Sequence, residues 1–172
     1  MRRIAPVLCV LAVTAVALAG GPSRAQTASD SQRQFADTFI AALGSGQTAR
    51  LRALVHPATL ACEAGPARDY VEAMFSRVMQ DGARFGPAYS IHQVVPMDGA
   101  ASGSPDFPFP AEPSYRMQID SETPARPMAM NVWLAPAGGG WLAVYPCPTA
   151  AGMKIFRENQ GRPLHGSETK VR

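Results

Sequence analysis

The chain has 172 residues, with 16 Lys and Arg against 13 Asp and Glu, and a sequence pI of about 9.0. This length fits one domain that can bury a sizeable core. Three of the basic residues, Arg2, Arg3 and Arg24, lie in an N-terminal leader, and without them the count is 13 basic against 13 acidic. The composition therefore gives no support for a nucleic-acid partner.

Residues 1–25 have the pattern of a cleavable export signal. Two arginines at positions 2 and 3 precede an apolar run over residues 4–19, and two glycines and a proline follow it. Ser23 and Ala25 place small residues where a signal peptidase reads them, which predicts cleavage after Ala25 and a periplasmic or secreted protein. A membrane anchor is the alternative, but the run is short for a span of about 20 residues. We therefore expect no stable membrane span after the leader is removed.

Two cysteines, Cys62 and Cys147, remain once the leader with Cys9 is removed. In an oxidising compartment they allow one intramolecular disulfide, which we predict. Their separation of 85 residues corresponds to about 4–5 kcal/mol of loop-closure entropy. Two free thiols or an intermolecular bridge are the alternatives. A redox role is not expected, because the chain has no Cys-x-x-Cys pair.

The first predicted helix begins at Ser31. Ser31 and Gln34 form a capping-box pattern, and apolar residues follow at four-residue spacing from Phe35 to Leu43. A Gly-Ser-Gly sequence over residues 44–46 then ends the helix.

Two further helices are predicted before any strand. The first covers residues 48–56 and is ended by Pro57, after which residues 58–62 form a connector or a short strand. The next begins at Pro66 and runs to about residue 80, before Gly82. Its inward face carries apolar residues at helical spacing, namely Val71, Met74, Phe75, Val78 and Met79.

The apolar pattern then changes to the two-residue period of strands. Alternation predicts strands over residues 89–95, 114–120, 128–134 and 141–145, and the last two form a hairpin around a glycine turn. Neither hairpin strand has a clean polar side, so both faces are expected to be covered. The helices cover one face, and the other can meet a second subunit, which makes a homodimer one expected arrangement.

Two segments are predicted to lie outside regular structure. Residues 96–113 hold five prolines, which argues against sheet. This loop is either a disordered excursion or a recognition loop whose Phe107 and Phe109 cover a pocket. Residues 149–172 are expected to form a basic, flexible tail after a single domain over residues 26–148.

The element order predicts an α+β fold, with three N-terminal helices packed on a curved antiparallel sheet of about four strands. With the Leu-x-x-Leu-Val-His-Pro sequence over residues 51–57, this order resembles the nuclear transport factor two-like superfamily of cone-shaped folds, across residues 30–147. This superfamily includes polyketide-cyclase-like and ketosteroid-isomerase-like proteins. It implies a cavity between the third helix and the inner sheet face, and frequent dimerisation through the outer face. It implies no activity, because one fold carries many functions.

Candidate residues for such a cavity are Asp69, Tyr70, Tyr115, Met117, Met130 and His56. An isomerase-like or cyclase-like enzyme can use Asp69 or His56 with Tyr115 as acid, base or oxyanion donor. Each of these three residues also has a structural interpretation. Asp69 is a carboxylate in the first turn of a helix, His56 is a residue that ends a helix, and Tyr115 is an aromatic ring that packs in the core or at its rim. The histidines are too scattered for a metal site, and no cofactor motif is present.

These observations favour an exported single-domain protein without a recognisable catalytic motif. We expect it to bind an apolar small molecule or a protein partner in a cavity between helix and sheet. The alternatives are an isomerase-like or cyclase-like enzyme that uses the same cavity, and a structural or assembly protein that dimerises through its sheet.

Overall fold

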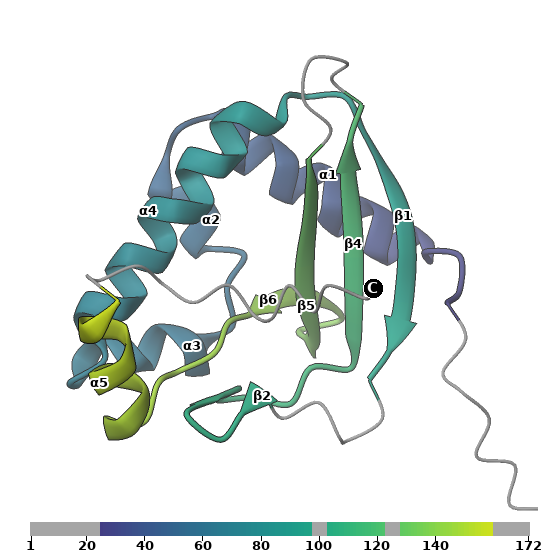
Figure 1. The fold of residues 1–172 in the computed structure, drawn as a ribbon. Helices are drawn as coiled ribbons and strands as arrows, with labels where there is room; N and C mark the ends of the chain where they lie inside the picture. The colour runs from purple at the N-terminus through teal and green to yellow at the C-terminus, as the bar shows by residue number, and fades with distance from the viewer. Residues whose placement is uncertain (1–24, 98–102, 123–127, 160–172) are drawn as a thin grey trace, which may run out of the picture.

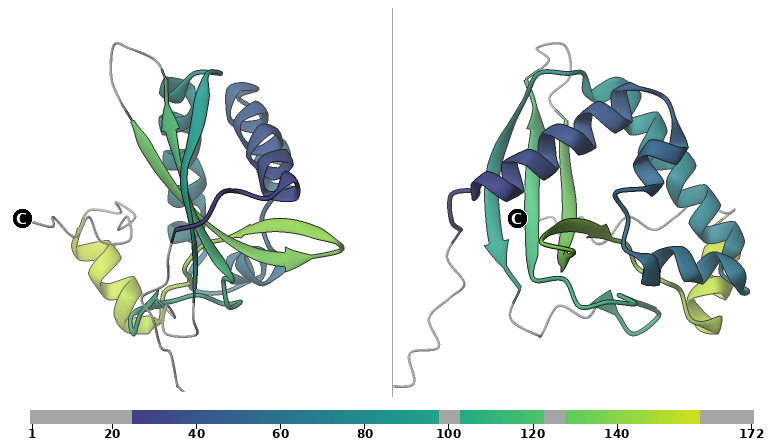
Figure 2. Two further views of the ribbon diagram at one scale, coloured as in Figure 1. Left: turned by 90° about the vertical axis from the view of Figure 1, so that its right-hand side faces the viewer. Right: turned by 180° about the vertical axis from the view of Figure 1, so that it is seen from behind.

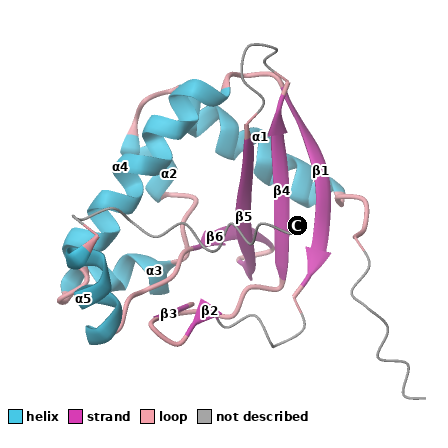
Figure 3. Cartoon of the chain, viewed as in Figure 1, coloured by secondary structure: helices cyan, strands magenta, loops and turns pink. Residues whose placement is uncertain are grey.

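The computed structural model describes residues 25–97, 103–122 and 128–159. The export-signal prediction rests on residues 1–24, which lie outside these ranges, as do residues 160–172 of the predicted tail. Among the described residues, no helix combines the length and the apolar character that crossing a membrane requires. The described chain has the predicted α+β fold, with helices packed against a four-stranded antiparallel sheet (Figures 1 and 3).

The helices mostly precede the sheet. They are α1 (Asp30–Gly44), α2 (Thr48–Arg52), α3 (Pro57–Ala61), a 3-10 turn at Cys62–Ala64, α4 (Arg68–Phe85) and the C-terminal α5 (Ala150–Glu158).

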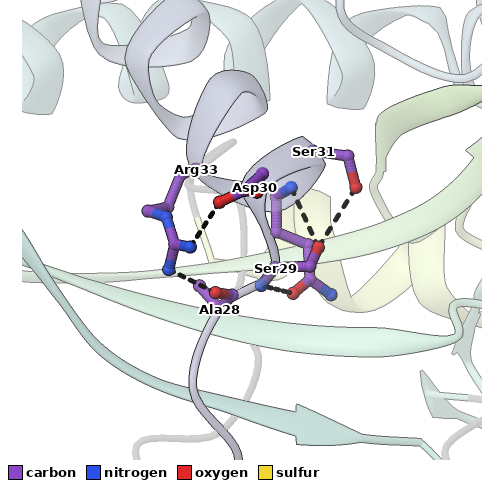
Figure 4. Close-up of polar contacts among 6 residues, drawn as sticks. Ala28, Ser29, Asp30, Ser31 and Arg33 are labelled. Carbon is purple, nitrogen blue, oxygen red and sulfur yellow. Dashed lines mark hydrogen bonds and ion pairs between the residues drawn. The ribbon is translucent and has the colours of Figure 1, made fainter.

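Helix α1 begins earlier than predicted, because Ser29 and not Ser31 is its N-cap. The Ser29 side chain accepts a hydrogen bond from the Gln32 backbone, and the Gln32 side chain accepts one from the Ser29 backbone (Figure 4). The Ser-x-x-Gln pattern of a capping box occurs twice here, at 29–32 and at 31–34. Gln32 is 2 % exposed, so burial of this amide accompanies the earlier start.

The prediction that Pro57 ends a helix is wrong, because Pro57 occupies the first position of α3. His56 is the N-cap, and its Nδ1 atom accepts a hydrogen bond from the Ala58 backbone at 3.2 Å. Proline suits a first helical turn, where its missing N–H has no intrahelical partner. Residues 58–62 are accordingly helical, rather than a connector or strand.

Helix α4 starts at Arg68 and continues to Phe85. The predicted end before Gly82 is therefore wrong. A Cβ atom built on Gly82 would lie 2.7 Å from the Leu43 Cβ atom of α1. The glycine therefore allows the two long helices to approach each other closely. The helix ends at Gly86, whose φ of 79° lies in the region that favours glycine.

The main sheet has the strand order β1 (Tyr89–Pro96), β4 (Tyr115–Ser121), β5 (Ala129–Ala137) and β6 (Gly140–Val144), with antiparallel neighbours. The predicted hairpin of the last two strands is confirmed, with Gly138 and Gly139 at positive φ in its turn. Strand β1 contains an irregularity between Ile91 and Gln93, which leaves His92 unpaired with β4.

The two faces of this sheet differ in character. Val94, Met117 and Val132 lie side by side on the inner face and are at most 1 % exposed. Helix α1 crosses the sheet on one side only, which the view from behind in Figure 2 shows. On the opposite, outer face, Gln118 lies beside the exposed Asn131, so the expectation that both faces of the hairpin strands are covered does not hold along β5.

The described parts of the proline-rich loop and of the C-terminal segment form regular structure, contrary to the predictions of no sheet in the loop and a flexible tail. A small second sheet forms within the loop, from β2 (Gly103–Ser104) and β3 (Phe107–Pro108). The segment expected to be flexible from residue 149 forms α5, whose Thr149 is an N-cap and whose Met153 and Phe156 are at most 4 % exposed. Short apolar clusters of this kind become helices when a core is available to bury them.

The predicted pairing of Cys62 with Cys147 is confirmed, with the two sulfur atoms at bonding distance and the Cα atoms 6.2 Å apart. The pair joins the end of α3 to the segment after β6. Next to it, the Cys147 backbone donates a hydrogen bond to the Pro108 carbonyl at 2.8 Å. The linkage thus joins the helical layer, the small sheet and the C-terminal segment.

Candidate functional site

Two of the residues predicted to line a cavity lie in the hydrophobic core. Tyr70 on α4 is 2 % exposed, and its ring contacts Phe107 and Phe156 at centroid distances of 5.6 and 5.4 Å. This burial raises the pKa of Tyr70 to about 12, because the phenolate is poorly solvated. Met117 has no exposed surface. Side chains from α4, the loop and α5 therefore fill the space around Tyr70.

The predicted acid and base residues do not meet in one place. Asp69 is exposed in the first turn of α4, and the His56 Nδ1 atom is occupied as the cap of α3. Tyr115 is half-buried and packs edge-on against Trp141 at 5.3 Å. Within the described part of the chain, no hydrogen bond or ion pair joins these three residues.

The remaining predicted residues separate as well. Met130 is half-buried on β5, and its neighbour on β4 is Ile119. Phe107 is part of the core, whereas Phe109 lies against Trp133 at 5.5 Å. The two phenylalanines therefore do not act together as a cover over one pocket.

An open groove of about 670 Å³ lies between the N-terminal end of α1 and the edge strand β1. One wall is formed by the segment 25–28 and by α1, and the other by the first half of β1. The lining residues are Ala25, Gln26, Thr27, Ala28, Arg33, Asp37, Tyr89, Ile91, His92 and Gln93.

The first wall is held by local hydrogen bonds. The Arg33 guanidinium donates to the Ala28 carbonyl and pairs with Asp30, as Figure 4 shows. The Gln26 backbone forms an antiparallel bridge with Val94, with N–H···O distances of 2.8 and 3.3 Å. The segment before α1 therefore lies along the edge of β1.

A tyrosine–carboxylate hydrogen bond joins the two walls at the far end of the groove. The Tyr89 hydroxyl on β1 donates to Asp37 on α1. Burial, followed by this hydrogen bond and the nearby carboxylate charge, raises the pKa of Tyr89 above its usual value. Tyr89 therefore remains a neutral hydrogen-bond donor at neutral pH.

A second groove of about 520 Å³ lies between α2 and α4. Its Arg52 guanidinium lies 4.8 Å from the centroid of the Phe75 ring and pairs with Glu63. This groove is smaller than the first, and its Arg52 guanidinium is already engaged by Glu63 and the Phe75 ring.

Sequence reasoning did not identify the groove between α1 and β1. Phe35 and Phe39 marked the buried side of α1, but nothing local indicated that Arg33 and Asp37 face β1. One usable signal was the pattern around His92, since the break in alternation there coincides with the irregularity of β1.

Comparison of the chain with protein-family models, with curated proteins and with solved structures gave no match. Among the described residues there is also no group of three or more His, Cys, Asp or Glu side chains arranged to hold a metal ion.

Proposed function

We propose that this chain is an exported binding protein that holds a small amphipathic molecule in the groove between α1 and β1. The observation that carries the proposal is the groove itself, which combines an apolar part at Ala28 and Ile91 with charged groups at Arg33 and Asp37. Ligand sites are typically concave and largely apolar, with a few polar groups that orient the ligand.

This proposal keeps the class of function expected from the sequence but places the binding site elsewhere in the fold. The expected site lay between α4 and the inner sheet face, where Tyr70 and Met117 are buried core residues. The groove at the edge of the sheet instead borders solvent, so a ligand can enter it without rearrangement of the core.

Export and superfamily membership form part of the same proposal. The N-terminal arginines, apolar run and small residues before position 26 support export, and a disulfide pair suits an oxidising compartment. Four helices before an antiparallel sheet support membership of the nuclear transport factor two-like superfamily.

Native mass spectrometry of the mature protein, purified from its own host, tests the binding function. We expect a retained small molecule in the wild-type protein. Thr27→Trp fills the groove from an exposed position and should remove the bound mass. Thr48→Trp is the matched control, because Thr48 is exposed and lines the second groove.

Two results would contradict the proposal. A wild-type protein without bound mass would argue against a ligand-binding role. A bound mass that both tryptophan variants retain, or that both lose, would argue against the groove between α1 and β1 as its location.

A further inference from the structure

The outer face of the sheet carries a continuous polar surface over β1, β4 and β5. Register places Gln93, Gln118 and Asn131 beside one another in a row across the three strands. Asp120 and Arg116 lie on the same face in the rows on either side, since side chains alternate along β4. With His92 at the irregularity of β1, these six residues are called the polar face.

No described helix lies over the polar face. Helix α1 crosses the opposite side of the sheet, and α5 lies low at one end of the molecule (Figures 1 and 2). Asn131 and His92 are exposed, and the other members of the polar face are partly exposed. The polar face is therefore accessible within the described part of the protein.

Polar contacts between side chains fix the orientation of four of the six residues of the polar face. Gln93 Nε2 donates to Gln118 Oε1 at 3.1 Å, and Gln118 Nε2 donates to Asp120 Oδ1 at 2.9 Å. The second oxygen of Asp120 lies 3.4 Å from His92 Nδ1. A chain of this kind holds the amide groups in place before any ligand arrives, which reduces the ordering cost of binding.

The other polar groups of this face remain unused. The side chains of Arg116 and Asn131 form no hydrogen bond or ion pair with any described residue. Arg116 also lies directly beside Trp133 on β5, whose half-buried ring packs against Phe109. Free amide and guanidinium donors thus lie next to an aromatic side chain on one flat surface.

From this arrangement we infer that the polar face binds a neutral saccharide. A sugar hydroxyl both donates and accepts hydrogen bonds, as the amides of Gln118 and Asn131 do. The charges of Arg116 and Asp120 balance, so the polar face complements an uncharged ligand better than a polyanion. Trp133 supplies apolar surface beside the amides, which suits the C–H groups of a sugar ring.

This site is separate from the proposed groove, although His92 and Gln93 lie at the border of both. The groove depends on the space between α1 and β1, whereas saccharide binding depends on side chains across β4 and β5. A variant such as Thr27→Trp should therefore leave saccharide binding unchanged, which separates failure of one proposal from failure of the other.

An array of neutral and acidic oligosaccharides, probed with the mature protein, is the first test. Isothermal titration calorimetry with the best-bound neutral oligosaccharide then compares Asn131→Ala and Arg116→Gln with wild type. We expect each variant to bind about tenfold more weakly, because each loses hydrogen bonds to the sugar. Gln34→Ala is the control, since it removes an exposed amide from α1 on the other side of the sheet.

The outcomes are distinct. Loss of affinity in Asn131→Ala and Arg116→Gln, with full affinity in Gln34→Ala, would support the inference. An array on which no neutral oligosaccharide binds, binding of acidic saccharides alone, or equal affinity in all variants would overturn it. Circular dichroism of each variant checks that the fold is kept, and the exposed position of Asn131 makes that variant the least disruptive.

Discussion

Gly82 offers a sharp test of how the two long helices pack, because two opposing effects act on the substitution Gly82→Ala. Alanine is favoured over glycine inside a helix by about 1 kcal/mol. The new methyl group would, however, lie 2.7 Å from Leu43 Cβ and 2.9 Å from Leu43 Cδ2. The Leu43 Cβ atom is fixed to the α1 backbone, so a rotamer change cannot relieve the first contact.

Steric overlap should therefore outweigh the gain in helix propensity. Forcing an extra methyl group into a packed interior costs about 1–3 kcal/mol, and a contact that requires the backbone to move belongs at the upper end of that range. After the propensity gain is subtracted, we expect Gly82→Ala to lower the free energy of unfolding by about 1–2 kcal/mol.

Urea denaturation followed by circular dichroism measures this difference, and Gly44→Ala is the matched control. Gly44 is the last residue of α1, is exposed, and has no atom within 4 Å of a built Cβ. That variant should be as stable as wild type or more stable, by up to about 1 kcal/mol. If Gly82→Ala were stabilised to the same extent as Gly44→Ala, the proposed close approach of α1 and α4 would be refuted.

Three further predictions follow from the same packing. The pKa of Tyr70 is about 12 in the folded chain, against about 10 in the unfolded chain, so the neutral tyrosine contributes fully to the free energy of unfolding below about pH 10 and loses this contribution as the pH rises toward 12. Urea denaturation at a series of pH values should therefore show a smaller alkaline loss of stability in Tyr70→Phe than in wild type, and an unchanged pH profile would contradict this reasoning. Cys147→Ala should cost at most about 4–5 kcal/mol of unfolding free energy, and titration of the unfolded, unreduced wild-type protein should find no free thiol, whereas two would disprove the bond with Cys62. Gly152→Ala would place a methyl group 2.1 Å from the Asp106 carbonyl oxygen and should detach α5 from the loop, seen as faster hydrogen exchange in residues 149–153; unchanged exchange would show that α5 tolerates the methyl group.

Local sequence patterns predicted much of the fold. The helical spacing around Phe35 and Phe39, the alternation along β1 and β4, and the glycine turn of the hairpin all appear where they were expected. The disulfide was predicted for a different reason, since only one pair of cysteines remains when the predicted leader is set aside. These features depend on neighbours in sequence or on simple counting.

The residues whose structural role was predicted wrongly are ones for which the local sequence allows two roles. Proline can either follow a helix or begin one. Pro57 begins α3 because residues 54–56 pack against β6, where the His56 backbone N–H donates a hydrogen bond to the Ala143 carbonyl at 2.8 Å. Glycine commonly ends a helix, but Gly82 continues α4 because Leu43 of another helix occupies the space of a side chain. In each case a distant segment decides between two local possibilities.

The candidate sites depended on tertiary structure even more strongly. Arg33 and Asp37 belong to α1 and face a strand more than 50 positions away, and the bond between Asp37 and Tyr89 spans 52 residues. Gln93, Gln118 and Asn131 form one row only because three strands pair in a particular register. The sequence by itself determined the two long helices, the four main strands and the cysteine pair, since spacing along a chain specifies which faces are apolar. Only the tertiary structure decided which polar side chains meet, because strand register and helix contacts arise from packing between distant segments.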